Sequence, residues 1–252
     1  MKLLCTISTR GRYNTTLPLA IQAVAMQTAK IDRLIIFDDN EFVMDLTRIF
    51  VYQRLFQILE SKGIEVMVMP GCRKGQQHNH QLANKAGYDW VWRIDDDTIP
   101  EPNVLSSLLA FTSVENVGAI GGSVLIPGMP LVPSHTGSSL IADIHSKHNS
   151  QWGLLDGTEK ADHLHCSFLY RAGVVDYELS LSRIGQREET IFTHELHRKG
   201  YHIVLTPCVT WHLEILIGGR RDGRADVLRE LFDQDEQFFK ERIKRWQLED
   251  LK

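Results

Sequence analysis

Cysteine is scarce in this sequence: its 252 residues include four, and no two of them form a C-x-x-C pair. This spacing gives no support for a disulfide framework, so we expect reduced thiols. No apolar run approaches the roughly 20 residues that a membrane-spanning helix needs. The opening apolar stretch is too short for a convincing signal peptide, which makes the cytoplasm the expected location, with peripheral contact to a membrane left open.

Positive charge is not in excess either. The chain has 28 lysines and arginines against 32 acids, a net charge of −4, which argues against a general nucleic-acid binder. Internal repeats and low-complexity tracts are also missing, which excludes solenoid architectures. With 43% hydrophobic and 24% charged residues, the composition is that of a globular protein, and the length suits one large α/β domain or one domain with a small appendage.

Strand-like and helix-like segments alternate four times within the first hundred residues. This rhythm predicts parallel strands joined by right-handed crossovers, with helices on both faces of the sheet. In open sheets of this class the ligand lies at the carboxyl ends of the strands. The expected strands cover residues 2–8, 31–41, 64–70 and 88–97, and the expected helices cover residues 15–28, 44–63 and 76–87.

The second half of the chain is less regular. The stretch from Pro127 to about Asp162 is rich in Pro, Gly, Ser and His, and a long irregular stretch in a compact domain is usually functional or mobile. The final segment has helical apolar spacing and predicts an amphipathic helix. The other predicted elements are helices over residues 103–113 and 187–201, and strands over residues 116–126, 164–175 and 202–214.

Three consecutive aspartates, Asp95, Asp96 and Asp97, follow "VWRI" at the end of the fourth expected strand. Adjacent carboxylates repel one another, so such a cluster needs a positive partner. Two of them at a strand end can hold a hard divalent cation through oxygen ligands, and Mg²⁺ or Mn²⁺ in turn binds phosphate. The alternative is an acidic surface turn in which one aspartate caps the next helix.

Four motifs in order resemble glycosyltransferase family 2. "IDDDTIPEP" looks like the D-x-D metal motif of the GT-A glycosyltransferases, and the opening "CTISTRGRYN" with "LIIFDDNE" is similar to that family's first and second strands. "REETIFTHELHRKGY" resembles its E-D-x-x-L helix, and "VTWHLE" resembles its late strand with a metal-binding histidine. The resemblance covers nearly residues 1–215. It implies a GT-A (Rossmann-like) α/β fold with a mostly parallel sheet, as a single domain plus a C-terminal helix.

The resemblance also divides the chain. Residues 1–215 would form the glycosyltransferase domain, with a nucleotide-binding half over 1–102 and an acceptor half over about 125–215. Residues 216–252 would form a flexible basic loop and the C-terminal amphipathic helix.

The nucleotide contacts that the resemblance implies lie at the strand ends. Thr9 and Asp39 would contact the base, with Asp38 as the second choice within the "FDDNE" pair. Further candidates for nucleotide contact are Arg10, Asp95 and Asp96.

The resemblance assigns metal ligands and a base as well. Asp95, Asp97 and His212 would hold Mn²⁺ or Mg²⁺, which neutralises the charge that develops on a leaving diphosphate. Glu189 would remove the proton from the attacking hydroxyl, and one base without a covalent nucleophile gives inversion at the anomeric carbon. The family's pair is Glu-Asp whereas this chain has Glu188-Glu189, so Glu188 is the second candidate for the base.

The segment "LIGGRRDGR", residues 216–224, gives another candidate. Arg220 and Arg221 after two glycines can clamp a diphosphate when a loop closes, or belong to a solvated linker. The family's Arg-Asn on the third helix is absent, and "QQHNHQ" stands in its place, which makes His78 and Asn79 weaker candidates.

Aromatic residues suggest where an acceptor sugar would stack. Trp152, in the irregular stretch, and Trp211, before the candidate metal ligand, are candidates for acceptor contact, while Trp90 and Trp92 alternate along a strand as core residues do. Histidines without four-ligand spacing do not support zinc sites, so we expect isolated polar or core side chains. These histidines are His163, His165, His194 and His197.

The expected activity is transfer of a sugar from a nucleotide-diphosphate sugar, with a UDP-sugar as the expected donor class, to an acceptor hydroxyl on a glycan, lipid-linked glycan, protein or modified nucleic acid. Two macromolecular partners are left open: a second copy of the chain in a homodimer, and a membrane surface against the last helix. One alternative is a sugar nucleotidyltransferase, although "STRGRYN" lacks the glycines of a G-x-G-T-R-like loop. The other is a non-catalytic binder of nucleotides or sugars, against which the D-x-D motif, the glutamate pair and His212 count.

Overall fold

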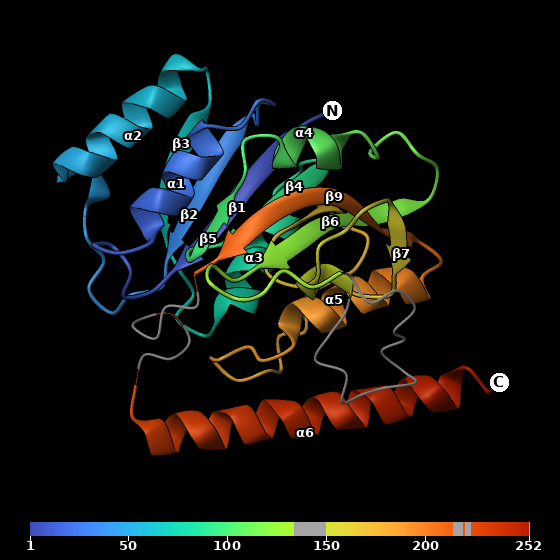
Figure 1. Ribbon diagram of the computed structural model, residues 1–252. Helices are drawn as coiled ribbons and strands as arrows, with labels where there is room; N and C mark the ends of the chain where they lie inside the picture. The colour runs from blue at the N-terminus through green and yellow to red at the C-terminus, as the bar shows by residue number, and fades with distance from the viewer. Residues whose placement is uncertain (134–149, 214–218, 220–222, 252) are drawn as a thin grey trace.

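A single twisted sheet runs through the centre of the molecule in the computed structural model, which describes residues 1–133, 150–213, 219 and 223–251 (Figure 1). Within these residues the sheet has nine strands in the order β3-β2-β1-β4-β8-β6-β9-β5, and β7 pairs with β9 outside this path. The strands are β1 (Leu3–Thr9), β2 (Arg33–Asp38), β3 (Glu65–Pro70), β4 (Trp90–Asp95), β5 (Thr98–Pro100), β6 (Val117–Leu125), β7 (Glu159–Ala161), β8 (Phe168–Arg171) and β9 (His202–His212).

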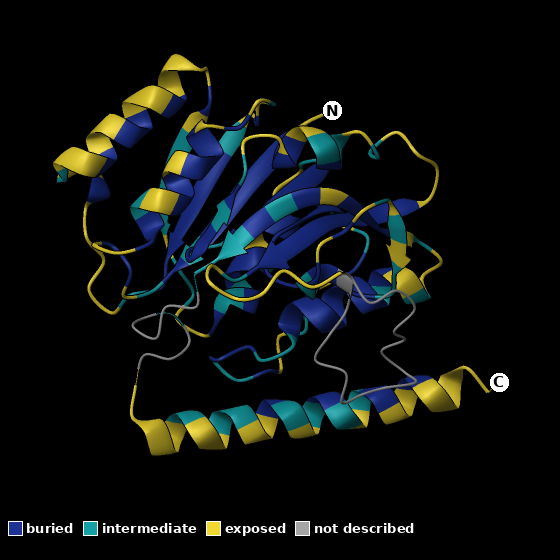
Figure 2. Ribbon diagram, in the orientation of Figure 1, coloured by how far each residue is buried: buried dark blue, intermediate teal, exposed yellow. Residues whose placement is uncertain are grey.

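Helices cover both faces of this sheet, as predicted. One core cluster joins the strands to α1, α2 and α4, and a second joins the opposite sheet face to α3 and α5. Along β1 the side chains of Leu3 and Cys5 belong to the first cluster and Leu4 to the second, so the strand is buried on both sides (Figure 2). The α-helices are α1 (Leu17–Ala25), α2 (Phe50–Ser61), α3 (Gln76–Asn84), α4 (Val104–Leu109), α5 (Glu188–Arg198) and α6 (Ala225–Glu249).

The predicted α/β class is confirmed, but only part of the sheet is parallel. Strands β3, β2, β1 and β4 are parallel neighbours, as the alternation of strands and helices requires. Beyond β4 the sheet is mixed, because β8 runs antiparallel to both β4 and β6. Of the eight pairings among the described strands, four are parallel and four antiparallel.

The last helix packs on the outside of α5 (Figure 1). Its buried residues Phe239, Ile243 and Trp246 form a small cluster with Ile191 of α5, and the Trp246 indole donates to Glu195 at 3.0 Å. This places one apolar stripe of α6 against the domain, with its outer side exposed (Figure 2). Among the described residues, no helix combines the length and apolar character that crossing a bilayer requires.

Two local features concern the starts of predicted helices. The predicted helix over residues 44–63 opens as a separate 3₁₀ turn, Leu46–Arg48, in which the Asp45 carboxylate accepts from the Thr47 N–H at 3.1 Å. Ile49 follows with an extended backbone and separates this turn from α2. Thr16 stands at the N-cap of α1, but its backbone is helical and its buried hydroxyl finds no partner among the described residues. The predicted core positions Trp90 and Trp92 are confirmed as buried.

The strand register brings the candidate site residues to one edge of the sheet. Thr9 at the end of β1 pairs with Asp38 at the end of β2, and Ser8 pairs with Asp95 at the end of β4. His212 ends β9 opposite Thr98, which begins the short strand after the aspartates. Segments from four distant parts of the sequence therefore meet at the carboxyl ends of the parallel strands.

Candidate active site

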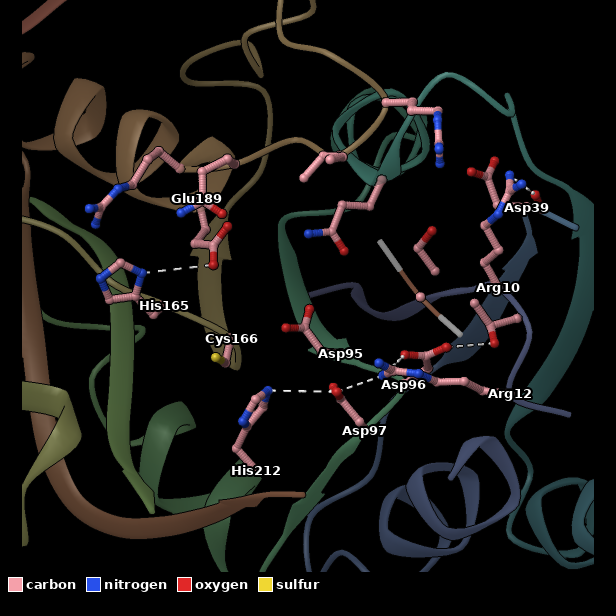
Figure 3. A pocket seen from close by; sticks show the side chains of 18 of the residues that line it. Arg10, Arg12, Asp39, Asp95, Asp96, Asp97, His165, Cys166, Glu189 and His212 are labelled. Atoms are coloured by element: carbon pink, nitrogen blue, oxygen red, sulfur yellow. Dashed lines mark hydrogen bonds and ion pairs between the residues drawn. The ribbon is translucent and has the colours of Figure 1, made fainter. Parts of the chain in front are cut away.

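A cavity of about 450 Å³ opens at this edge of the sheet (Figure 3). Arg10 and Asp39 lie on one side of it and Glu189 with His165 on the other, while the aspartates of the loop after β4 lie between them. The predicted residues that line the cavity are Thr9, Arg10, Asp39, Asp95, Asp96, Asp97, Trp152, Glu189 and His212.

The positive partner that the three aspartates require is Arg12, from the loop after β1. Its guanidinium lies 2.7 Å from the Asp96 carboxylate and 2.6 Å from that of Asp97, with all three side chains nearly buried. Asp96 also accepts a hydrogen bond of 2.7 Å from the hydroxyl of Thr9. Asp96 therefore connects β1 to the loop after β4 instead of pointing freely into the cavity.

The acidic loop remains short of positive charge despite Arg12. Burial raises the pKa of Asp96 to about 7, and the attraction of Arg12 offsets only part of that rise. Burial also raises the pKa of Asp95, although Arg93 acts in the opposite direction. Because a bound cation favours the ionised form of neighbouring carboxyl groups, these raised pKa values fit a cation site at this position.

The residues predicted to hold a metal do lie together. Ligand atoms of Asp95, His212 and Cys166 lie within 4.8 Å of one another, and the Asp97 carboxylate is 3.7 Å from Nε2 of His212. The Nδ1 atom of His212 is buried and finds no hydrogen-bond partner among the described residues. Two carboxylates and an imidazole are a suitable donor set for Mn²⁺ or Mg²⁺. The buried thiol of Cys166, whose pKa is raised, was not predicted at this place.

The two members of the "DD" pair after β2 have different surroundings. Asp39 lines the cavity, where its carboxylate accepts from the Arg73 N–H at 2.6 Å and from the Asn79 amide at 3.3 Å. Asp38 is fully buried behind it and accepts hydrogen bonds from the Tyr13 hydroxyl and from Asn40. The placement agrees with the preference for Asp39, and it leaves Asp38 without access to a ligand.

Arg10 extends the same side of the cavity. Its guanidinium donates to the backbone carbonyl of Asp39 at 3.2 Å, and its own carbonyl accepts from the Gly219 N–H at 2.6 Å. The chain after β9 therefore returns to the cavity at Gly219. The predicted clamp residues Arg220 and Arg221 lie outside the described residues.

The two adjacent glutamates at the start of α5 differ in their access to the cavity. Glu189 lines the cavity, and its carboxylate lies 3.7 Å from Nδ1 of His165 (Figure 3). Glu188 is fully buried and pairs with the guanidinium of Arg93 inside the sheet. The geometry therefore favours Glu189 over Glu188 as the residue that can meet a substrate.

The structure also separates the two tryptophan candidates. Trp152 lines the cavity, with its ring centroid 6.2 Å from that of His165 and 6.0 Å from that of His212. Trp211 precedes His212 on β9, where successive side chains point to opposite faces, and its indole donates to Glu101 at 3.2 Å. Trp211 is not among the residues that line the cavity.

Several residues of the site do not follow from sequence reasoning. The sequence predicts His165 as an isolated polar or core histidine, whereas it lies beside Glu189. It assigns no role to Arg12, which lines the cavity, or to Arg93, which is buried beside it. The signal for Arg93 is a single arginine inside the otherwise apolar run "WVWRI". The loop before α5 contributes further lining residues that were not singled out, namely Arg183, Gln186 and Arg187.

Known proteins resemble this chain in their family sequence pattern and in their fold. The family described as Glycosyl transferase family 2 matches residues 6–176. Two solved structures share the fold: GalNAc-T7 with UDP, GalNAc and Mn²⁺ (TM-score 0.60, 10% identity, 84% of this chain and 44% of that one), and S. aureus TarS (TM-score 0.54, 12% identity, 86% of this chain and 36% of that one). The chain spans less than half the length of either structure. No curated protein matches it significantly.

Proposed function

The chain belongs to glycosyl transferase family 2, and from that premise we propose that it transfers a sugar from a nucleotide-diphosphate sugar to an acceptor hydroxyl, with inversion. The observation that carries this proposal is the arrangement of one cavity. Glu189 lies on one side, Arg10 and Asp39 on the other, and the D-x-D aspartates between them (Figure 3). In-line displacement needs a base and a leaving group on opposite sides of the sugar.

A UDP-sugar is the donor class that we propose. The side of the cavity formed by Thr9, Arg10 and Asp39 offers one hydroxyl, one cation and one anchored carboxylate, which suit the polar edge of a nucleoside. GalNAc-T7, which shares the fold at a TM-score of 0.60, was crystallised with UDP, GalNAc and Mn²⁺. The same donor class is therefore the first to test on this chain.

Asp95, Asp97 and His212 would hold the divalent ion, Mn²⁺ or Mg²⁺. When bound, such an ion acts as a Lewis acid that stabilises the negative charge on a departing diphosphate. Arg12 holds Asp97 at 2.6 Å, and Arg93 holds Asp95 at 2.6 Å, so both carboxylates of the motif are fixed in place by arginines. The protein thus supplies an ordered set of donors that does not have to reorganise on binding.

Glu189 is the base in this proposal. Its carboxylate faces the cavity from the first turn of α5, where it can accept the proton of an acceptor hydroxyl. Nδ1 of His165, 3.7 Å away, and the indole of Trp152 border the same region. Trp152 offers an apolar face on which an acceptor sugar can stack.

Mass spectrometry after incubation with UDP-sugars and Mn²⁺ tests the proposal. Slow release of UDP through hydrolysis of the donor supports sugar transfer, whereas pyrophosphate would indicate a nucleotidyltransferase and no product a non-catalytic binder. Asp97→Ala should abolish the rise in melting temperature that UDP with Mn²⁺ produces. The matched control is Asp233→Ala, on the exposed side of α6, where the same rise should persist. An unchanged rise in the Asp97 variant would contradict the metal site.

A further inference from the structure

Arg93 is a charged residue in the middle of a core strand. It lies on β4 between Trp92 and Ile94, and its side chain has 0% exposure to solvent. Arginine is almost never fully buried without partners, because removing a guanidinium from water is costly. The contacts of Arg93 therefore indicate the role of its side chain.

The guanidinium contacts both functional parts of the cavity. Its Nη2 donates to Oδ1 of Asp95 at 2.6 Å, and Asp95 is the first acid of the D-x-D motif. Its Nη1 pairs with Oε1 of Glu188, in the first turn of α5, and lies 3.9 Å from Oε2 of Glu189. One planar side chain thus connects the diphosphate side of the cavity to the helix that carries the base.

The first turn of α5 is held from two sides, and Arg93 is the contact on the side of the sheet. Arg187, at the N-cap, has a left-handed backbone with φ of 69° and makes no capping hydrogen bond through its side chain. On the inner side, the Glu188 carboxylate pairs with Arg93 and accepts from the Gln76 amide at 3.1 Å. On the outer side, α6 holds the same end through Asp235, which accepts from the Gln186 N–H at 2.9 Å, and Glu236, which pairs with Arg187. Glu188 is therefore the attachment of this turn to the strand that carries the aspartates.

The buried pair of Arg93 and Glu188 is not optimised for stability. Nε of Arg93 and Oε2 of Glu188 are both buried without a hydrogen-bond partner among the described residues. A buried ion pair with unsatisfied atoms contributes little to folding, and apolar residues of similar volume often replace such pairs without loss.

We propose that Arg93 is a positioning residue that fixes the distance between the D-x-D motif and the base. This inference rests on the proposed function, because it takes Asp95 as a metal ligand and Glu189 as the base. Through Asp95 the guanidinium orients the group that holds the donor diphosphate, and through Glu188 it anchors the turn that presents Glu189. A displacement of about 1 Å between such groups can cost about 100-fold in rate.

The test compares Arg93→Met/Glu188→Met with the wild type and with Arg33→Met. The double variant removes the charges of Arg93 and Glu188 together, so that Glu188 does not stay behind as an uncompensated buried charge; Asp95, the other partner of Arg93, is unchanged. Arg33 is the matched control: it lies on β2 and pairs with Glu65 at the surface, away from the cavity. We expect the double variant to keep the UDP and Mn²⁺ thermal shift and a donor KM within about threefold of wild type, and to lose about 100-fold in the kcat of transfer.

Two single variants separate positioning from packing. Arg93→Lys keeps the charge but cannot reach both carboxylates at once, so kcat should fall about tenfold with the donor KM unchanged. Glu188→Gln keeps the shape and loosens only the attachment of α5, with a similar expected loss. If the double variant folds and retains kcat within about threefold of wild type, Arg93 is a packing residue and the inference is wrong. A wild-type protein without turnover would instead overturn the proposed function.

Discussion

The guanidinium of Arg12 lies 2.6 Å from the carboxylate of Asp97, and both side chains are less than 10% exposed. Arg12 comes from the loop after β1 and Asp97 from the loop after β4, which are 85 residues apart in sequence but follow neighbouring parallel strands. The same guanidinium pairs with Asp96. Without substrate, this arginine therefore partly neutralises an acidic loop that would otherwise repel itself.

Replacing Arg12 by methionine should destabilise the metal-free protein by about 3 kcal/mol, because it leaves two buried carboxylates without their cation. The urea-induced unfolding midpoint, followed by circular dichroism, measures this change. Arg48→Met is the control: Arg48 pairs with Asp45 on the exposed surface, where such pairs contribute at most about 1 kcal/mol. Equal losses in the two variants would show that Arg12 does not stabilise the acidic loop.

Glu189→Gln should reduce the kcat of sugar transfer by about 10² to 10⁴, the usual contribution of a general base, because the amide cannot accept the proton. Binding of UDP with Mn²⁺, followed by thermal shift, should stay as in the wild type, since Glu189 lies across the cavity from Arg10 and Asp39. Full activity in this variant would exclude Glu189 as the base. Glu60→Gln, on the exposed side of α2, serves as the control.

Trp152→Ala should raise the KM for the acceptor by about tenfold, since stacking on an aromatic ring contributes roughly 1 kcal/mol or more. The rate of donor hydrolysis in the absence of acceptor should change less, because the proposed nucleoside contacts Arg10 and Asp39 are on the other side of the cavity from His165, which lies next to Trp152. Trp211→Phe is the matched control, since Trp211 does not line the cavity and bonds to Glu101. A higher acceptor KM in the Trp211 variant alone would reverse the assignment of the two tryptophans.

His194 should make the protein less stable in mild acid. Burial lowers the pKa of His194 from 6.5 to about 4, although the Asp162 carbonyl next to it acts in the opposite direction. Between these two pH values the unfolded chain binds a proton that the folded chain does not. The stabilisation is therefore complete above pH 6.5 and is lost as the pH falls toward 4.

The expected loss from this histidine is about 2 kcal/mol between pH 7 and pH 5. Urea unfolding of the wild type and of His194→Asn at both pH values isolates it, because every other titrating group is common to the two proteins. Other charged and titratable groups near the ring are Asp162, His163 and His197. The same loss in both proteins would show that His194 already titrates normally in the folded state.

Much of the fold follows from local patterns. The apolar runs that become β1, β2 and β4 are buried on both faces, and the periodic segments between them form α1, α2 and α3. Their alternation sufficed to predict which strand ends would meet, and hence that Thr9, Asp39 and the aspartates would share a cavity. The pairing of β8 between β4 and β6 was not readable, because four residues carry no signal of strand direction.

The candidate site shows the same division. The resemblance to glycosyltransferase family 2 singled out Asp95, Asp97, His212 and Glu189, and all four line the cavity. The motifs and their spacing could not reveal that Glu189 lines the cavity while Glu188 is buried beside Arg93, because the difference depends on how the first turn of α5 packs on β4. Nor could they choose Trp152 over Trp211, since an irregular stretch has no periodicity from which to infer direction.

By itself the sequence determined the order of strands and helices and the acidic strand end, since backbone preference and hydrophobic period act over a few residues. Only the tertiary structure decided that Arg12 neutralises that end and that Arg93 also reaches Glu188, because these partners are 84 and 95 residues apart along the chain. Charge pairing acts through space over a few ångströms, and chain separation does not constrain it.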